Sequence, residues 1–354
     1  MDIYRIDSHK LMFHVDRVHE WLHGAAVYPI YIEIGITDIC NQHCIFCAFD
    51  YLKHKPVFFR KDVFSRFMSN AARKGVKSIM LSGQGEPLLH PDVAQMVRAA
   101  VKNGIDVAIT SNGVRFMPDL SRELLPLLSW FKVSIDAGTS ATYATIHGCP
   151  PEEFRVVLRN MEEAVCFRNK AKIACTLGAQ FLLLPHNYRE AGILVRIARD
   201  IGLDYCVLKP YSHHPMSLHR ISSDDRSGAI DRAAEAATRY SNNGFKVVYR
   251  SRTAEYIKND KPYRRCFGTE FTTLVTSCGD VYPCNYFIGN KDFMLGNLNT
   301  SSFEDIWEGR RRKQVMAYMR TKWSVARCRK GCRVDAVNRY LWELSHPSAH
   351  VNFI

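Results

Sequence analysis

Residues 31–47 read YIEIGITDICNQHCIFC, a short apolar run that leads directly into a group of three cysteines. The cysteines are Cys40, Cys44 and Cys47. Three thiolates within eight residues can wrap one face of an iron–sulfur cubane and leave the fourth iron without a protein ligand. A structural zinc takes four protein ligands, so a zinc knuckle completed by His43 is the alternative reading of this loop.

Short apolar runs recur along the following 180 residues and alternate with amphipathic stretches. The candidate strands are Ile30–Gly35, Ser78–Ser82, Val107–Thr110, Trp130–Ile135, Gly178–Leu184 and Tyr205–Lys209. The helical stretches are Val63–Lys74, Pro91–Asn103, Leu120–Leu128, Phe154–Arg168 and Tyr188–Ile201. This alternation is typical of βα units around a parallel sheet, and six units predict an α/β fold with a partial (β/α)6 TIM-like barrel. Such barrels place their chemistry where the strands end.

The pattern changes after residue 210. Segment 211–262 is polar, contains one helical stretch at Ser227–Tyr240, and is expected to connect across the barrel. From Cys266 onward two β-like runs turn at Gly279-Asp280, which predicts a hairpin. Helical periods follow at Ser302–Met319 and Asp335–His346. The predicted units are an N-terminal extension (1–29), the barrel (30–225), a connecting segment (226–262) and a cysteine-rich domain with a final helix (263–354).

Composition limits the class of protein. The 354 residues are 47% hydrophobic and 23% charged, which fits a globular protein and excludes disorder. Neither a long apolar run nor a secretory leader is found, so we expect a cytoplasmic protein with no membrane partner. Twelve cysteines in such a chain favour metal ligation over disulfides. The net charge of +13 indicates an anionic partner, but no basic stripe interleaved with aromatics predicts nucleic acid.

The cysteine triplet on the loop after the first strand resembles the signature of the radical S-adenosylmethionine (SAM) enzymes. The resemblance implies that Cys40, Cys44 and Cys47 hold a 4Fe–4S cluster whose open iron binds the amino and carboxylate groups of SAM. One electron then cleaves SAM to methionine and a 5′-deoxyadenosyl radical. Phe46 stands where family members place a residue near the adenine, and a role in the core is its alternative.

Three further strand ends resemble family motifs. Ser82–Pro87, SGQGEP, is similar to the G-G-E-P motif that meets the methionine amino group, with Gln84 between the glycines. Thr110–Gly113 ends the third strand, and Ser134–Asp136 ends the fourth, where family members bind the SAM carboxylate and ribose. The residues that the resemblance assigns to SAM are Phe46, Gly83, Gly85, Glu86, Pro87, Asn112, Ser134 and Asp136.

The C-terminal cysteines have the spacing Cys266-x12-Gly279-x4-Cys284, followed by Cys328-x3-Cys332. This resembles the twitch domain, the short form of the SPASM extension, built from a β-hairpin and helices. The resemblance implies a second 4Fe–4S cluster held by Cys266, Cys284, Cys328 and Cys332. Cys278 is the spare, and a packed thiol is its simpler reading.

Charge also bears on the substrate. With two clusters bound the protein would still carry roughly +10, which favours an anionic small-molecule substrate. The loop after the sixth strand carries Lys209, His213 and Arg220 at the expected catalytic face, where they could bind a phosphate or carboxylate. A solvated basic loop is the alternative.

Together these features resemble twitch radical SAM enzymes of sugar, aminocyclitol and nucleoside antibiotic pathways. The expected reaction is hydrogen abstraction from a hydroxyl-bearing carbon of a sugar-like, nucleoside or sugar-nucleotide substrate. Diol dehydration or dehydrogenation follows, with the second cluster as electron relay and flavodoxin or ferredoxin as reducing partner. Decarboxylation or epimerisation of a uronate-type sugar is an alternative. Peptide modification is another alternative, although the expected domain organisation does not include an N-terminal peptide-binding domain. A non-enzymatic iron–sulfur electron carrier leaves the strand-end motifs unexplained.

Overall fold

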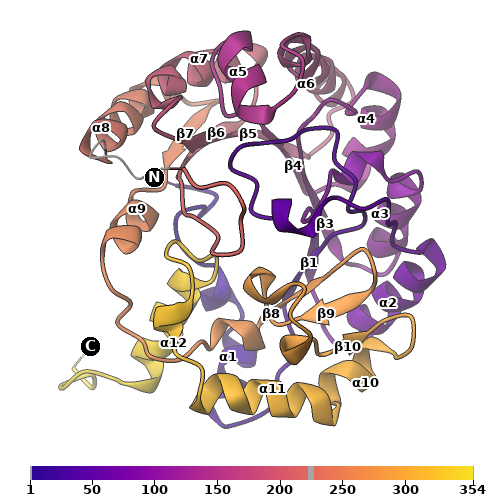
Figure 1. Ribbon diagram of the computed structural model, residues 1–354, viewed down its shortest axis with the longest axis vertical. Helices are drawn as coiled ribbons and strands as arrows, with labels where there is room; N and C mark the ends of the chain where they lie inside the picture. Colours follow the sequence, from indigo (N-terminus) through magenta and orange to yellow (C-terminus); the bar gives the residue numbers. More distant parts are fainter. Residues whose placement is uncertain (1, 222–226, 354) are drawn as a thin grey trace.

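The computed structural model describes residues 2–221 and 227–353, and these residues form one ten-stranded sheet with helices around it (Figure 1). The strands are β1 (Tyr31–Ile34), β2 (Ser78–Leu81), β3 (Asp106–Ser111), β4 (Trp130–Ser134), β5 (Thr176–Leu183), β6 (Tyr205–Pro210), β7 (Lys246–Tyr249), β8 (Thr272–Val275), β9 (Asp280–Tyr282) and β10 (Gly296–Asn297). Their order is β10-β9-β8-β1-β2-β3-β4-β5-β6-β7. The pairs from β8 to β7 are all parallel, and β9 and β10 extend the β8 edge antiparallel.

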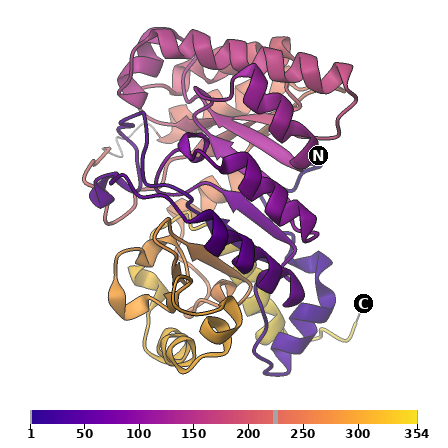
Figure 2. The same cartoon turned by 90° about the vertical axis from the view of Figure 1, so that its right-hand side faces the viewer.

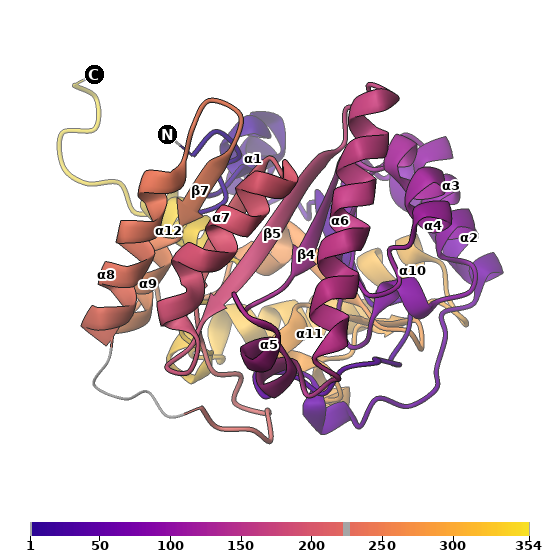
Figure 3. The ribbon, with the colours of Figure 1, turned by 90° about the horizontal axis from the view of Figure 1, so that it is seen from above.

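Helices cover the outer face of the parallel strands, as α6 and α7 do beside β4 and β5 (Figure 3). The helices are α1 (Val15–Leu22), α2 (Lys61–Arg73), α3 (Val93–Lys102), α4 (Pro118–Leu124), α5 (Ser140–His147), α6 (Glu152–Lys170), α7 (Ala191–Ile201), α8 (Ser227–Ala237), α9 (Ser251–Lys258), α10 (Phe303–Glu308), α11 (Arg310–Thr321) and α12 (Asp335–Ser345). The C-terminal hairpin and α10–α11 lie beyond β1, next to the βα half of the molecule (Figure 2). No described helix combines the length and apolar character needed to cross a membrane.

The two faces of the parallel strands differ in polarity. Successive strand residues point to opposite faces, and the outward ones, such as Phe131 and Val133 of β4, are fully buried in the main core. Lys132 between them therefore points inward, as does Glu33 of β1 between Ile32 and Ile34. Parallel strands covered on both faces are usually apolar throughout, so a polar inner face marks a ligand-binding interior.

The N-terminal segment packs against the inner face where the strands begin. Tyr4 lies 5.2 Å from Tyr205, ring centre to ring centre, and Tyr4 contacts an apolar cluster of Tyr205, Val207 and Val248. A side chain at Gly178 would collide with the Tyr205 ring, which explains the glycine in β5. This end of the interior is filled, so only the end where the strands finish is left for chemistry.

The predicted fold class is confirmed, and each of the six predicted strands is present. Contrary to the expectation, the βα alternation continues after residue 210, because α8 is followed by β7, which pairs parallel with β6. The hairpin at Gly279 is also part of the barrel sheet, since β8 pairs parallel with β1. The helical stretch predicted at Ser302–Met319 breaks at Gly309, which caps α11. The predicted boundary at residues 225 and 226 lies outside the described residues.

Candidate functional site

The loop after β1 carries the first thiol set, Cys40, Cys44 and Cys47, and is held by backbone contacts on both sides. The amides of His43 and Ile45 donate to the carbonyls of His147 and Ile146 in α5, at 2.8 and 3.0 Å. A Cβ on Gly148, which ends α5 in the left-handed conformation, would lie 2.6 Å from the His43 carbonyl oxygen. The loop therefore depends on α5, a helix that the sequence did not predict.

The first thiol set is largely buried. Burial raises the pKa of Cys40 to about 12 and that of Cys44 well above its usual value, and the charges of Cys40 and Cys47 add to the rise at Cys44. Three buried thiolates need a cationic group to compensate them, which is the donor set of an iron–sulfur cluster. His43, which would complete the alternative zinc knuckle, is exposed.

His147 is a neighbour of the first thiol set that the sequence did not reveal. Its Nδ1 lies 3.2 Å from the Cys44 Sγ, and its Nε2 donates to the Ile135 carbonyl at 2.8 Å. Burial lowers the pKa of His147 to about 4, so the ring is neutral at pH 7. The Phe46 ring packs edge-on against the same imidazole, 5.6 Å away between centres, and also contacts an apolar cluster with Leu182.

The Ser82–Pro87 turn packs against the cysteine loop. A Cβ on Gly85 would lie 2.3 Å from the Ile39 carbonyl oxygen, to which the Glu86 amide also donates at 2.7 Å. The close approach of the cysteine loop thus explains why position 85 is glycine, whereas the sequence analysis expected the close approach to be that of SAM. Gly83, in the left-handed region at φ +114°, packs on Gly35 of the same loop.

The Glu86 side chain ties the ends of β2 and β3 together. Its carboxylate accepts hydrogen bonds from the Ser111 hydroxyl and the Asn112 amide, both at 2.8 Å, and from the Leu88 amide at 3.0 Å. Asn112 in turn donates to the Asn41 side chain at 2.8 Å. Pro87 begins a buried helical turn after Glu86. These residues hold the strand ends and the cysteine loop in one arrangement.

Two predicted SAM residues differ in access. Ser134 is half-buried on the inner side of β4. Asp136 has no exposed surface, adopts φ +54°, and accepts from the Leu182 amide at 2.5 Å; its burial raises the pKa of the carboxyl to about 7. Gln84, whose side chain lies against Gly35, is buried, and neither its amide oxygen nor its nitrogen has a hydrogen-bond partner in the described part of the chain. A buried unpaired amide beside the cysteine loop fits a polar ligand such as SAM.

The second thiol set comprises Cys266, Cys284, Cys328 and Cys332. Burial raises the pKa of Cys284 well above its usual value, and the charges of the other three thiols raise it further, so the four lie together. The Trp323 indole nitrogen donates to the Cys328 Sγ at 3.2 Å, and the Asn338 amide to the Cys266 Sγ at 3.5 Å. Such donors stabilise ligated thiolates and tune a bound cluster. Cys278 is exposed, and its charged neighbours are Asp38, Asp280 and Lys55 instead.

Residues 211–219, here called the strap, contact both the first cysteine loop and the segment after Cys284. The Ser217 hydroxyl donates to the Cys47 carbonyl at 2.9 Å, and the buried His214 ring stacks parallel to Tyr51 at 5.8 Å between centres. His214 also lies 6.0 Å from Tyr286, two residues after Cys284. The sequence pointed to His213 in this segment, whereas the buried histidine is His214.

The three predicted substrate residues are not brought together. Lys209 lies on β6, and His213 is half-buried next to the Tyr211 hydroxyl, 3.3 Å from its Nδ1. Arg220 is exposed, and the charged groups that act on Lys209 are Arg250, Arg329, Lys132 and Arg333. Lys209 thus lies with the basic residues of the interior while Arg220 is on the surface, and substrate binding by this loop stays a prediction.

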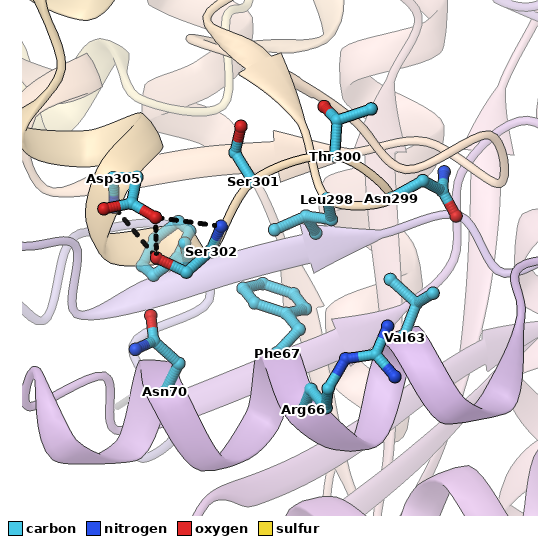
Figure 4. Close-up of a pocket in the computed structure, with 11 residues that line it drawn as sticks. Val63, Arg66, Phe67, Asn70, Leu298, Asn299, Thr300, Ser301, Ser302 and Asp305 are labelled. Carbon is cyan, nitrogen blue, oxygen red and sulfur yellow. Dashed lines mark hydrogen bonds between the residues drawn. The ribbon is translucent and has the colours of Figure 1, made fainter.

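A separate cavity of about 310 Å³ lies between α2 and the segment before α10 (Figure 4). Phe67 and Asn70 form one wall, and Ser302 and Asp305, which exchange the capping hydrogen bonds of α10, form the other. No cysteine and no predicted SAM or substrate residue lines it. The cavity is thus distinct from the candidate site.

Comparison with known proteins agrees with this geometry. Residues 34–178 match the Radical SAM superfamily, and residues 266–333 match SPASM, an iron–sulfur cluster-binding domain. The chain is a radical SAM enzyme. It binds SAM and a 4Fe–4S cluster, and its SPASM domain indicates further iron–sulfur binding.

Relatives of this radical SAM enzyme are distant but extensive. It is 23% identical to the tungsten-containing aldehyde ferredoxin oxidoreductase cofactor-modifying protein of Pyrococcus furiosus, over 79% of this chain and 81% of the relative. It is 25% identical to the PqqA peptide cyclase of Streptomyces rochei, over 87% and 85%. The fold is similar to that of Streptococcus suis SuiB bound to its precursor peptide SuiA, with a TM-score of 0.67 and 17% identity over 95% of this chain and 77% of SuiB.

Proposed function

We propose that this enzyme abstracts a hydrogen atom from a hydroxyl-bearing carbon of an anionic small molecule bound on the inner face of the barrel. The observation that carries the proposal is that the loop between Cys328 and Cys332 places two arginines against the barrel. Arg329 donates to the Ser212 carbonyl at 2.7 Å, and Arg333, next to Cys332, donates to the Tyr31 hydroxyl at 3.0 Å and to Glu33. The loop of the second thiol set therefore borders the barrel interior, and the strap that Arg329 contacts also reaches the first cysteine loop through Ser217.

Each part of the site has a role in this reaction. When bound, the cluster and SAM supply a 5′-deoxyadenosyl radical, once an external donor such as flavodoxin or ferredoxin has provided one electron. Cys40, Cys44 and Cys47 hold the first cluster, and Gln84 offers its unpaired amide to SAM. Hydrogen abstraction leaves an unpaired electron on the substrate carbon. Forming a ketone requires that one electron and the hydroxyl proton then leave, and the second thiol set would hold the acceptor of that electron. Loss of a neighbouring hydroxyl as water instead leaves a radical next to a new carbonyl, and one electron, from a donor that the second thiol set would hold, and one proton must then be added to give the deoxy product.

Two other reactions are compatible with this site. One begins with the same hydrogen abstraction, and the other uses a different substrate. Decarboxylation or epimerisation of a uronate-type sugar requires no different arrangement of residues. Peptide modification is the second candidate, because the peptide cyclase and SuiB are similar to this chain over most of its length. The basic inner face favours a small anion, and the cofactor-modifying relative and the heme synthase of Methanosarcina barkeri, 24% identical, carry non-peptide names.

Deuterium transfer tests the proposal. The anaerobically reconstituted enzyme is given SAM, dithionite and sugar phosphates or nucleotides deuterated at their hydroxyl-bearing carbons. We expect one of these compounds to transfer deuterium to 5′-deoxyadenosine. The same compound should raise the rate of 5′-deoxyadenosine formation above the rate without substrate. Stimulation by a peptide, with no transfer from any sugar or nucleotide, would instead establish the second candidate.

A further inference from the structure

Five basic side chains converge inside the barrel from separate parts of the chain, and we call them the inner basic cluster: Lys132, Lys209, Arg250, Arg329 and Arg333. Lys132 and Lys209 belong to β4 and β6, which flank β5. Arg250 follows β7, and the two remaining arginines come from the loop of the second thiol set. Burial lowers the pKa of Lys209 and the charges of the other four lower it further, so all four lie within electrostatic reach of Lys209.

Two members of this cluster are compensated by carboxylates. Arg333 forms an ion pair with Glu33 of β1, and the Arg250 Nε lies 3.6 Å from Asp7. These pairs also fix the position of the loop that carries Arg329. Asp136 is the remaining nearby acid, and it interacts electrostatically with both Lys209 and Lys132, but its carboxyl group is sealed from solvent.

The other three cations have no such partner. Neither Lys132, Lys209 nor Arg329 forms an ion pair with a described carboxylate, and neither lysine ammonium has a hydrogen bond to the described part of the chain. Arg329 uses one Nη on the Ser212 carbonyl, and its buried Nε has no partner. All three are half-buried. Partly buried cations that lack a paired carboxylate offer a binding site for an anion.

Solvent reaches this part of the interior. Lys132 is half-buried although its strand neighbours Phe131 and Val133 have no exposed surface. Arg333 keeps 46% of its side-chain surface exposed while it binds Glu33, which is 9% exposed. Solvent thus reaches Lys132 and Arg333 of the inner basic cluster.

We propose that Lys132, Lys209 and Arg329 bind a phosphoryl group of the substrate, as a phosphate monoester or a diphosphate. A phosphoryl group brings nearly two negative charges and three strong acceptor oxygens, enough for cations on separate walls, whereas a single carboxylate brings one charge. The planar guanidinium of Arg329 matches phosphate geometry, with the lysines as point charges. This proposal rests on the proposed function, which identifies the interior as the substrate site. It replaces the three substrate residues expected from the sequence, Lys209, His213 and Arg220.

Pyrophosphate binding to the reconstituted holoenzyme, measured by calorimetry without reductant, tests this site separately from catalysis. We expect Lys132→Met and Lys209→Met each to weaken binding at least tenfold, about 1.4 kcal/mol, with Lys209→Arg retaining most of it. Lys102→Met, an exposed lysine at the end of α3, serves as the matched control and should bind like the parent. Iron content and SAM cleavage without substrate report that each variant is folded.

Three results would overturn the assignment. They are no binding by the parent enzyme, equal binding by both lysine variants with iron content retained, or tighter binding of malonate than pyrophosphate with the same dependence on Lys132 and Lys209. Loss of SAM cleavage in the parent with pyrophosphate binding intact would overturn the proposed function and leave this site standing.

Discussion

Cys40, Cys44 and Cys47 share one loop of eight residues, whereas the second thiol set collects cysteines that span positions 266 to 332. The first set lies on a single loop, which contacts α5, the Ser82–Pro87 turn and the strap. The second needs the hairpin, the segment after α11 and α12 to pack together. The comparison teaches that close spacing along the chain is enough to bring the first three thiols together. The four dispersed thiols stay together only as long as the segments that carry them stay packed.

Removing the first thiol set should have the largest effect. In the triple variant Cys40→Ala, Cys44→Ala, Cys47→Ala we expect reconstituted iron to fall from about eight to about four per chain, because one of two cubanes is lost. Formation of 5′-deoxyadenosine should disappear. Iron analysis and chromatography of the products measure both, with the exposed Cys166→Ala as control. Continued SAM cleavage by the triple variant would refute the assignment of these ligands.

Removing one member of the second set should separate the two halves of the reaction. Cys284→Ala is expected to lose the second cluster's iron and to stop product formation, while 5′-deoxyadenosine still forms because the first loop is intact. Cys278→Ala, at the exposed hairpin position, should resemble the parent. Iron loss in the Cys278 variant, with a normal count in the Cys284 variant, would mean that the hairpin ligand is Cys278.

A buried ion group supports the second set and should respond to a single change. Glu270, four residues after Cys266, binds Arg312 at 2.8 Å and also Arg320, and both Glu270 and Arg312 are almost fully buried. Glu270→Gln leaves buried charge unpaired, so we expect a loss of about 3–5 kcal/mol in the free energy of unfolding. The second cluster's iron should be lost before SAM cleavage declines.

Chemical denaturation and iron analysis measure this prediction. Asp62→Asn is the matched control, because its ion pairs with Arg60 and Arg66 lie on the surface and should contribute little to stability. If Glu270→Gln lowered SAM cleavage as much as it lowered the second cluster's iron, the two thiol sets would not differ in their dependence on packing.

The smallest effect concerns the hydrogen bond to Cys328. Trp323→Phe keeps the aromatic packing against Phe287 and Phe293 but removes the indole donor. Losing a donor to a ligated sulfur should lower the reduction potential of the second cluster with little change in iron content. An anaerobic redox titration followed by electron paramagnetic resonance measures it, with Trp342→Phe as control. An unchanged potential would show that this donor does not tune the cluster.

Much of the scaffold follows from local pattern. The six βα units, the cysteine loop and the hairpin at Gly279 are all visible in the sequence, because strand periodicity, helix periodicity and turn residues act over a few neighbours. The short strand β7 was missed, since four residues, KVVY, carry too weak a pattern between polar flanks. The helix α5 was missed as well, and with it the contact between His147 and Cys44.

By itself the sequence determined which cysteines are close enough along the chain to act together, and it determined the order of strands and helices that surround them. Only the tertiary structure decided that β8 joins β1 and that Arg333 reaches Glu33. It alone decided that Lys209 faces Lys132 and the arginines, while Arg220 stays in solvent. The physical reason is that spacing and periodicity describe neighbours along the chain, whereas contacts between residues hundreds of positions apart depend on how the strands pair and on which groups share the buried interior.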